Sequence, residues 1–441
     1  MMDVGLMTLL LFGTLFLLLA VGMPVAFALA GVTVVYGYIL LGPKAFYILT
    51  TQVYGSMLNA ILLAIPLFFL MAHVLQHSGM ADELYGAVHQ WLGGLKGGLA
   101  MGTVIICTLF AAMSGISGAA TVAMGLIALP AMLKRNYDKR IAVGCIAAGG
   151  VLGILIPPSV IMILYAMISR ESVGGMFFGG VIPGLVLSGL FIIYIGIRST
   201  LQPLLGPPVP PEERVSLKQR IISLKSVVLP IALVVLVLGS IYSGAATPTE
   251  AAGVGAVGAF VCAIIYRRLN WRVLIDIIRG TFKVTGMVMW IVAAAAAFTG
   301  LYIALGAQAL IIEVVTGLPV NPWAILIGIQ AVLFLFGMFM DDFAIVMLCA
   351  PIFVPIVRAL GFDTLWFGIL FIVNMQMAFL TPPFGYNLFY LRGVAPKEVT
   401  MGDIYRSIIP FVGLQALGLA LVMIFPKLAL WLPSMMIKQA G

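Results

Sequence analysis

Long apolar runs separated by short polar segments follow one another along almost the whole chain. A helix needs about 20 apolar residues to cross a bilayer, and many of these runs reach that length. The stretches 77–96 and 267–283 mix charged and apolar residues, so we expect them to lie at the membrane surface. The pattern thus predicts an all-α polytopic membrane protein. Its full spans are expected over residues 4–22, 25–41, 55–75, 174–197, 226–244, 248–266, 285–304 and 407–426.

Two other apolar segments, residues 97–133 and 321–357, are each too short for two full crossings. The first has Ser114-Gly115-Ile116-Ser117-Gly118 at its midpoint, and the second has the tip Gly337 to Asp342. Two half-length helices that meet at such a tip form a re-entrant hairpin. Non-helical backbone is tolerated at membrane depth only where protein or a water-filled cavity surrounds it.

Proline pairs interrupt two further apolar segments. The spans over 141–168 and 364–391 break at Pro157-Pro158 and at Pro382-Pro383, and the two pairs are 225 residues apart. Each broken span follows a hairpin and precedes a single span, which indicates a duplicated design. The predicted parts are a first repeat over residues 1–198, a proline-rich and extended linker over 199–225, and a second repeat over 226–441.

The distribution of basic residues predicts the topology. If each repeat makes five full crossings besides its hairpin, the odd number inverts the second repeat relative to the first. Eighteen of the 23 basic residues then lie on one face, which the positive-inside rule makes cytoplasmic. Both termini are therefore expected outside. Because topology explains the basic residues, the net charge of +8 does not indicate a nucleic-acid partner. The basic residues of the outer face are Lys44, Arg170, Arg358, Lys427 and Lys438.

The interruptions offer a specific chemistry. Carbonyl oxygens freed at a helix break, together with hydroxyl or carboxylate oxygens, can bind a hard cation such as sodium, and free N–H groups at a half-helix N-terminus attract a carboxylate. An aspartate at membrane depth costs about 3 kcal/mol unless it has a partner. Each tip paired with its own break is expected to make one sodium site, with the anionic substrate between them. The cation candidates are Ser114, Ser117, Gly153, Pro157, Gly337, Asp341, Asp342 and Thr381, and the substrate candidates are Ser159, Pro158, Gly118, Thr121, Pro383 and Asn387.

Simpler interpretations exist for several of these residues. The proline pairs could be kinks, and Ser114 and Ser117 could be small residues that allow close helix packing. His73 and His77 have the i, i+4 spacing of metal ligands, but no zinc motif surrounds them. We expect these histidines at the membrane interface, and we expect no metal other than sodium.

The motifs together resemble the large membrane subunit of a tripartite ATP-independent periplasmic (TRAP) transporter. The resemblance rests on the Ser114–Gly118 tip, the run Gly153 to Ser159, the segment Thr247-Pro248-Thr249-Glu250-Ala251 and the run Thr381 to Gly385. It implies an elevator-type transporter of the ion-transporter superfamily in the bacterial inner membrane. Scaffold spans in 4–75 and 226–304 would support a mobile domain that holds the hairpins and broken spans.

The same resemblance implies the cargo and the partners. A sodium gradient would drive uptake of a small organic acid, such as a C4-dicarboxylate, sialic acid or a similar carboxylate. A soluble periplasmic binding protein would deliver this acid, and a separate small four-helix membrane subunit would complete the system. Sodium would act as the coupling ion, with no other cofactor and no enzymatic activity.

Two alternatives remain open. A self-sufficient sodium–carboxylate symporter of similar architecture would need neither partner, and transport by the purified chain alone would favour it. An intramembrane hydrolase could use Ser114 or the Asp341–Asp342 pair. Against the hydrolase, the sequence has no His-Glu-x-x-His motif, no second aspartate-bearing span that could supply an opposing carboxylate, and, as we expect, no histidine near either tip.

Overall fold

The computed structural model describes residues 3–436, and the expected outer residue Lys438 lies outside them. Throughout residues 3–436 the regular structure is helical, without strands. Eight helical segments in this range are long and apolar enough to cross a membrane. Many large apolar side chains, among them Leu9, Ile39 and Phe282, are exposed on the outer surface. The prediction of an all-helical polytopic membrane protein is therefore confirmed.

The helices of the first half and of the linker follow the chain in a simple order. They are α1 (Val4–Ala20), α2 (Val25–Leu41), α3 (Lys44–Met57), the short 3₁₀ helix η1 (Ala60–Leu63), α4 (Ala64–His77), α5 (Met80–Leu92), α6 (Gly98–Ser114), α7 (Ser117–Lys134), α8 (Lys139–Val151), η2 (Leu152–Ile154), α9 (Val160–Ser169), α10 (Val173–Leu201), η3 (Pro203–Leu205), η4 (Pro211–Glu213) and α11 (Leu217–Ser223).

The second half has a closely similar order. Its helices are α12 (Lys225–Tyr242), α13 (Pro248–Ile265), α14 (Trp271–Ala304), α15 (Ala307–Thr316), α16 (Pro322–Gly337), α17 (Asp342–Ala359), α18 (Thr364–Phe379), α19 (Tyr386–Val394), α20 (Met401–Ile424) and α21 (Lys427–Ser434). The helix pair α6–α7, the interrupted pair α8–α9 and the long helix α10 recur as α16–α17, α18–α19 and α20.

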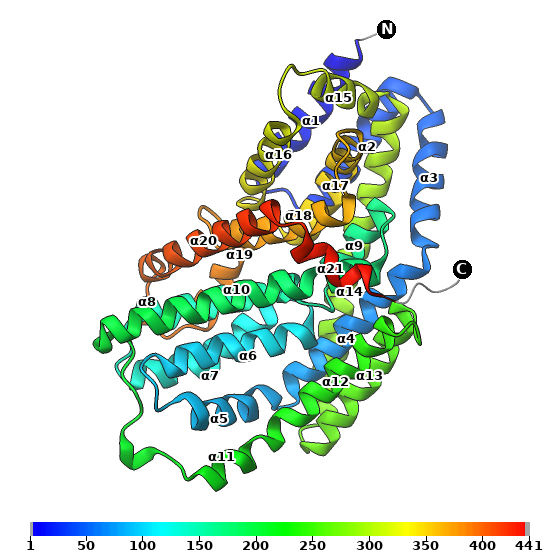
Figure 1. Cartoon of the computed structure of the whole chain (residues 1–441). Coiled ribbons are helices and arrows are strands. Elements are labelled where there is room, and N and C mark those ends of the chain that lie inside the picture. Colours follow the sequence, from blue (N-terminus) through cyan, green and yellow to red (C-terminus); the bar gives the residue numbers. More distant parts are fainter. Residues whose placement is uncertain (1–2, 437–441) are drawn as a thin grey trace.

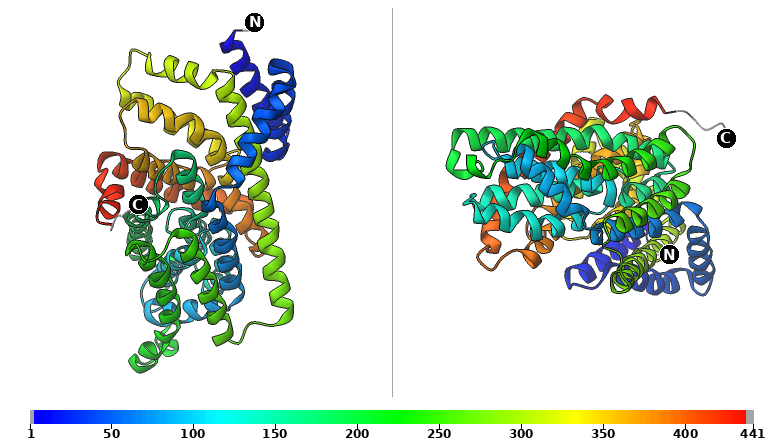
Figure 2. Two further views of the ribbon diagram at one scale, coloured as in Figure 1. Left: turned by 90° about the vertical axis from the view of Figure 1, so that its right-hand side faces the viewer. Right: turned by 90° about the horizontal axis from the view of Figure 1, so that it is seen from below.

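The two halves differ where α14 lies. The sequence pattern predicts a surface stretch over 267–283 followed by a span over 285–304, whereas α14 is one continuous helix along one side of the molecule (Figure 2). The corresponding part of the first half is divided into two helices, α3 and α4. The span expected over 55–75 therefore begins too early, because its first residues belong to α3. The reason is local: the Asn59 side chain accepts a hydrogen bond from Ile61 N–H (3.0 Å) and begins a new helix, whereas the position 225 residues later is Val284.

The linker is not simply extended, which corrects the prediction made from its prolines. It contains η3, η4 and α11, and its middle pairs with the loop between α5 and α6. Gly97 N–H donates to the Gly206 carbonyl (2.8 Å), and Val209 N–H donates to the Gly93 carbonyl (2.7 Å). The Val209 side chain is buried. These contacts hold the linker against the first half of the chain.

The remaining helices pack side by side around a large apolar core. Helices α5, α6, α7 and α10 lie roughly parallel, and α18 and α20 continue this stack (Figure 1). Helices α4 and α13 pack closely against each other, and α14 packs on α2, α3 and α4. The fold brings together the tips of the helix pairs α6–α7 and α16–α17, because residues of both tips line one cavity.

Candidate substrate and cation site

The first hairpin tip packs directly on the first helix break. Gly115 ends α6 in a left-handed conformation (φ 65°), which favours glycine. A Cβ atom at Gly115 would lie 2.4 Å from the Pro158 carbonyl oxygen, and a Cβ atom at Gly153 would lie 2.7 Å from the Ile116 carbonyl oxygen. Glycine is therefore required on both sides of this contact. The Ser159 hydroxyl donates to the Ile154 carbonyl (2.7 Å) and accepts from Met162 N–H (3.4 Å), which starts α9.

The second tip meets the second break in a similar way. A Cβ atom at Gly337 would lie 2.3 Å from Cβ of Ala378, so α16 approaches α18 as closely as its glycine allows. Phe384 N–H donates to the Met338 carbonyl at the tip (3.3 Å). The Thr381 hydroxyl donates to the Met377 carbonyl (2.8 Å) and thereby satisfies part of the broken end of α18.

The two tips face one cavity of about 220 Å³. The first tip contributes Ser117 and Gly118, and the second contributes Asp341 and Asp342. Helix α4 contributes His73 on another side. The other lining residues are Ala72 and Gln76 of α4, Ile116, Ala119 and Val122 near the start of α7, Val284 and Met287 of α14, Phe343 of α17, Phe379 of α18, and Tyr386 and Tyr390 of α19.

The N-terminus of α7 faces this cavity without a side-chain cap. Four consecutive residues, 116–119, belong to its wall, and Ile116 at the N-cap position has no side-chain oxygen that could accept a hydrogen bond. The free N–H groups and the helix dipole favour an anion there. By contrast, α17 is capped by its own carboxylates, because Ala344 N–H donates to Asp341 (3.0 Å) and Phe343 N–H donates to Asp342 (3.2 Å).

A larger apolar cavity of about 970 Å³ adjoins the first. Met287, Asp341 and Tyr386 line both cavities, so the two spaces are neighbours that share a wall. The larger one extends between the turn that joins α1 to α2, helix α14 and the second hairpin. Its lining includes Phe16, Leu19, Met23, Phe27, Ala30, Trp290, Leu335, Phe336, Phe339 and Phe384.

The predicted site residues fall into two groups. Ser117, Gly118, Asp341 and Asp342 line the smaller cavity together. The others do not line it: Ser114, Thr121, Ser159 and Asn387 are fully buried, Gly153, Pro157, Pro158 and Gly337 are buried, Thr381 is partly buried and Pro383 is exposed. Of the expected substrate contacts, Gly118 alone lines this cavity.

A hydrogen bond between the two halves accounts for two buried members of the second group. The Thr121 hydroxyl of α7 donates to Oδ1 of Asn387 in α19 (2.6 Å), and Asn387 Nδ2 donates to the Ala147 carbonyl of α8 (2.8 Å). Gln376 of α18 likewise donates to the Val151 carbonyl (2.9 Å). These polar contacts join the first hairpin, the first broken span and the second broken span into one unit.

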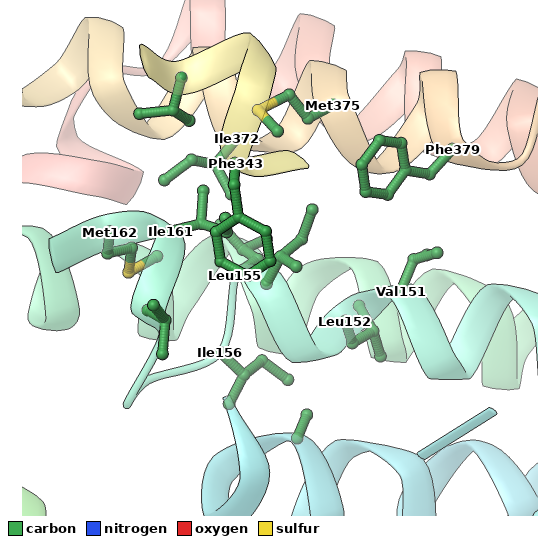
Figure 3. Packing of buried hydrophobic residues seen from close by; sticks show 14 of the residues in the cluster. Val151, Leu152, Leu155, Ile156, Ile161, Met162, Phe343, Ile372, Met375 and Phe379 are labelled. Carbon is green, nitrogen blue, oxygen red and sulfur yellow. The ribbon is translucent and has the colours of Figure 1, made fainter. Parts of the chain in front are cut away.

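Apolar side chains also hold the second hairpin and the second broken span against the first break. Phe343 of α17 and Ile372 and Met375 of α18 lie over Leu155 and Ile161 at the first break (Figure 3). All five side chains are buried. The second hairpin and the first break thus share one core, which positions the aspartates relative to the first tip.

Several cavity residues were not anticipated from the sequence. His73 lies in the wall of the cavity that both tips line. This corrects two expectations from the sequence, namely that His73 lies at the membrane interface and that no histidine lies near either tip. Its ring nitrogen Nδ1 is 2.8 Å from the Phe69 carbonyl. His73 and Gln76 are three residues apart, so they share one face of an otherwise apolar helix. This spacing of polar residues is a signal from which both could have been predicted as cavity residues. Tyr386 and Tyr390 show a similar spacing on α19.

The fold and the cavity define a polytopic helical membrane protein whose interrupted hairpins and helices enclose a mixed polar and apolar site. Residues 12–428 match the family model described as "Tripartite ATP-independent periplasmic transporter, DctM component". The chain belongs to this family, which confirms the resemblance carried by the motifs. The family is one of transporter permeases and not of enzymes.

Individual proteins of known name are similar to this chain along most of their length. The chain is 36% identical over 397 residues to the C4-dicarboxylate TRAP transporter large permease protein DctM of Pseudomonas aeruginosa, covering 90% of this chain and 91% of that protein. It is 30% identical over 428 residues to the ectoine TRAP transporter large permease protein TeaC of Halomonas elongata, covering 97% and 99%. The YdaH transporter of Alcanivorax borkumensis shares the fold, with a TM-score of 0.65, 16% identity and coverage of 96% and 98%.

Proposed function

We propose that this chain is the large permease of a sodium-driven importer that carries a small organic acid across the bacterial inner membrane. One observation carries the proposal: both hairpin tips line a single cavity, with the uncapped N-terminus of α7 on one side and Asp341 and Asp342 on the other. Such a site offers N–H donors for a carboxylate and carboxylate oxygens for a cation.

Sodium would bind at the two junctions between a tip and its own break. Ser114, Ser117 and the carbonyl groups around Gly153 and Pro157 supply oxygens at the first junction. Asp341, Asp342 and Thr381 supply them at the second. The substrate alone would bring an unpaired negative charge into a region of low dielectric constant, and sodium alone would bring an unpaired positive charge. Bound together, the two charges compensate each other, so the loaded site can cross the membrane at lower cost.

The movement would be of the elevator type, with two repeats inverted relative to each other and both termini in the periplasm. The position of the cavity supports this proposal, because α4 and α14 line one side and the hairpins line the other. Scaffold helices would remain in place while the unit built from hairpins and broken spans slides past them. The distribution of basic residues supports the orientation.

Two partners would complete the system. A small four-helix membrane subunit would bind the scaffold, and a soluble periplasmic binding protein would deliver the acid. Membership of the tripartite family supports both partners. Relatives named for C4-dicarboxylate and ectoine indicate that substrates vary among similar permeases.

Uptake into proteoliposomes tests this proposal. Vesicles would contain the chain with its candidate small subunit, and binding protein loaded with labelled acid would be added outside, with or without an inward sodium gradient. We expect uptake only when all three proteins and sodium are present. Uptake by the chain alone would favour a self-sufficient symporter, and uptake driven by a proton gradient without sodium would contradict the cation sites.

A further inference from the structure

The smaller cavity has few groups that could balance a negatively charged solute. Within residues 3–436, its lining contains no Lys and no Arg, and it contains the two carboxyl groups of Asp341 and Asp342. Besides the N-terminus of α7, the group that could carry a positive charge is the imidazole of His73. This polar end can satisfy one carboxylate. The two sodium ions of the proposed function match the two negative charges of Asp341 and Asp342, so a second substrate carboxylate would be desolvated with no matching cation, which is costly.

Other residues in the lining are apolar, and the neighbouring cavity adds room for more than a carboxylate. Val284, Met287 and Phe379 line the smaller cavity, and Met287 also lines the larger one. Beyond the shared wall, the larger cavity presents aromatic side chains such as Phe336, Phe339 and Phe384. The two neighbouring cavities therefore combine polar groups of both tips with the aromatic side chains of the larger cavity, and Met287, Asp341 and Tyr386 lie between the two spaces.

We propose that the transported acid is a monocarboxylate with an apolar, ring-sized body. Its carboxylate binds at the N-terminus of α7 beside Ser117 and Gly118, and its body extends into the aromatic cavity between Met287, Asp341 and Tyr386, the three residues that line both cavities. This inference rests on the proposed function and narrows it to one class of acid. It separates this chain from the relative named for C4-dicarboxylates, since a C4-dicarboxylate carries a charge at each end.

Direct binding to the purified full chain in nanodiscs tests the inference without the selectivity of a binding protein. The probes are 3-phenylpropanoate, with one charge and a ring, acetate, with one charge and no ring, and succinate, with two charges. We expect sodium-dependent binding in which 3-phenylpropanoate binds at least about tenfold more tightly than acetate or succinate, because its ring is buried.

A pair of variants on α2 locates the apolar end. Ala30 lines the larger cavity, so Ala30→Phe fills part of it. This change is expected to weaken binding of 3-phenylpropanoate about tenfold and to leave acetate binding within about twofold. Val35→Phe is the matched control, because Val35 lies on the same helix, is 53% exposed and does not line the cavity. It should change neither affinity.

The possible outcomes separate the two proposals. Sodium-dependent binding of succinate that is tighter than that of 3-phenylpropanoate would overturn the substrate class and leave the sodium–carboxylate function intact. Equal effects of Ala30→Phe and Val35→Phe would overturn the position of the apolar body. Failure of sodium to promote binding of any of the three acids would overturn the proposed function together with the inference.

Discussion

The two adjacent aspartates show how single residues determine what this site can bind. Asp341 caps α17, while Asp342 is the first residue of that helix and is 9% exposed. Both carboxyl groups line the cavity, and the hydrogen bonds to Ala344 N–H and Phe343 N–H use part of their acceptor capacity. The remaining oxygens need a partner in a medium that solvates charge poorly. A coupling cation would be that partner.

Neutralising Asp342 is expected to weaken sodium activation. Asp342→Asn keeps a carbonyl oxygen and removes the charge, so the apparent affinity for sodium in the uptake assay should fall at least about tenfold, or about 1.4 kcal/mol. The matched control is Asp82→Asn on the amphipathic helix α5, where the side chain is exposed. Sodium activation that is the same in both variants would contradict a cation site at the second tip.

Removing the Thr121–Asn387 hydrogen bond tests whether contacts between the two halves stabilise the protein. Thr121→Val retains the shape of the side chain and removes the hydroxyl that donates to Asn387. Because both residues are fully buried, we expect a loss of about 1 kcal/mol in stability, measured as a lower midpoint of thermal unfolding in detergent. Thr121→Ser, which keeps the hydroxyl, should unfold close to the wild type. A valine variant as stable as the serine variant would contradict the importance of this bond.

At the scale of elements, the sequence contains clear signals for the interruptions. Glycine, serine and proline at the tips and breaks cannot continue a buried helix without cost, so the ends of α6, α16 and α18 are visible in the sequence. The continuity of α14 is not visible, because charged residues before Lys283 mark a surface without ending a helix. The location of His73 in the cavity could not be predicted either, since it depends on how α4 packs against both hairpins.

The contact between the first tip and the first break depends on Gly115. Gly115→Ala would require a residue with a side chain to adopt a left-handed conformation, which costs about 1–2 kcal/mol of stability. It would also place Cβ against the Pro158 carbonyl oxygen. We expect a lower unfolding temperature and weaker sodium-dependent binding of the substrate. Gly189→Ala in α10 is the control, because a Cβ there has no neighbour within 4 Å and alanine favours a helix. An equal fall in unfolding temperature in the two variants would contradict this account of the tip.

At the scale of the whole molecule, the linker between the two halves offers a way to test the membrane topology. Its middle is fixed by hydrogen bonds to the loop between α5 and α6, whereas residues 210–214 are exposed. The Arg135–Glu213 ion pair (2.7 Å) lies at this exposed part, so it contributes little to stability. A protease can therefore reach this exposed turn, and the orientation of both repeats determines the side of the membrane on which the turn lies.

Cleavage in oriented vesicles tests that orientation. A protease that cuts after glutamate should cleave at Glu212 or Glu213 in inside-out vesicles and leave this turn intact in right-side-out vesicles, because the distribution of basic residues predicts a cytoplasmic linker. The double variant Glu212→Gln, Glu213→Gln should abolish the cut and serves as the control. After cleavage, the two fragments should still purify together, since Thr121, Asn387 and Gln376 join the halves through buried hydrogen bonds. Cleavage of the turn from the periplasmic side would contradict this topology and place both termini in the cytoplasm.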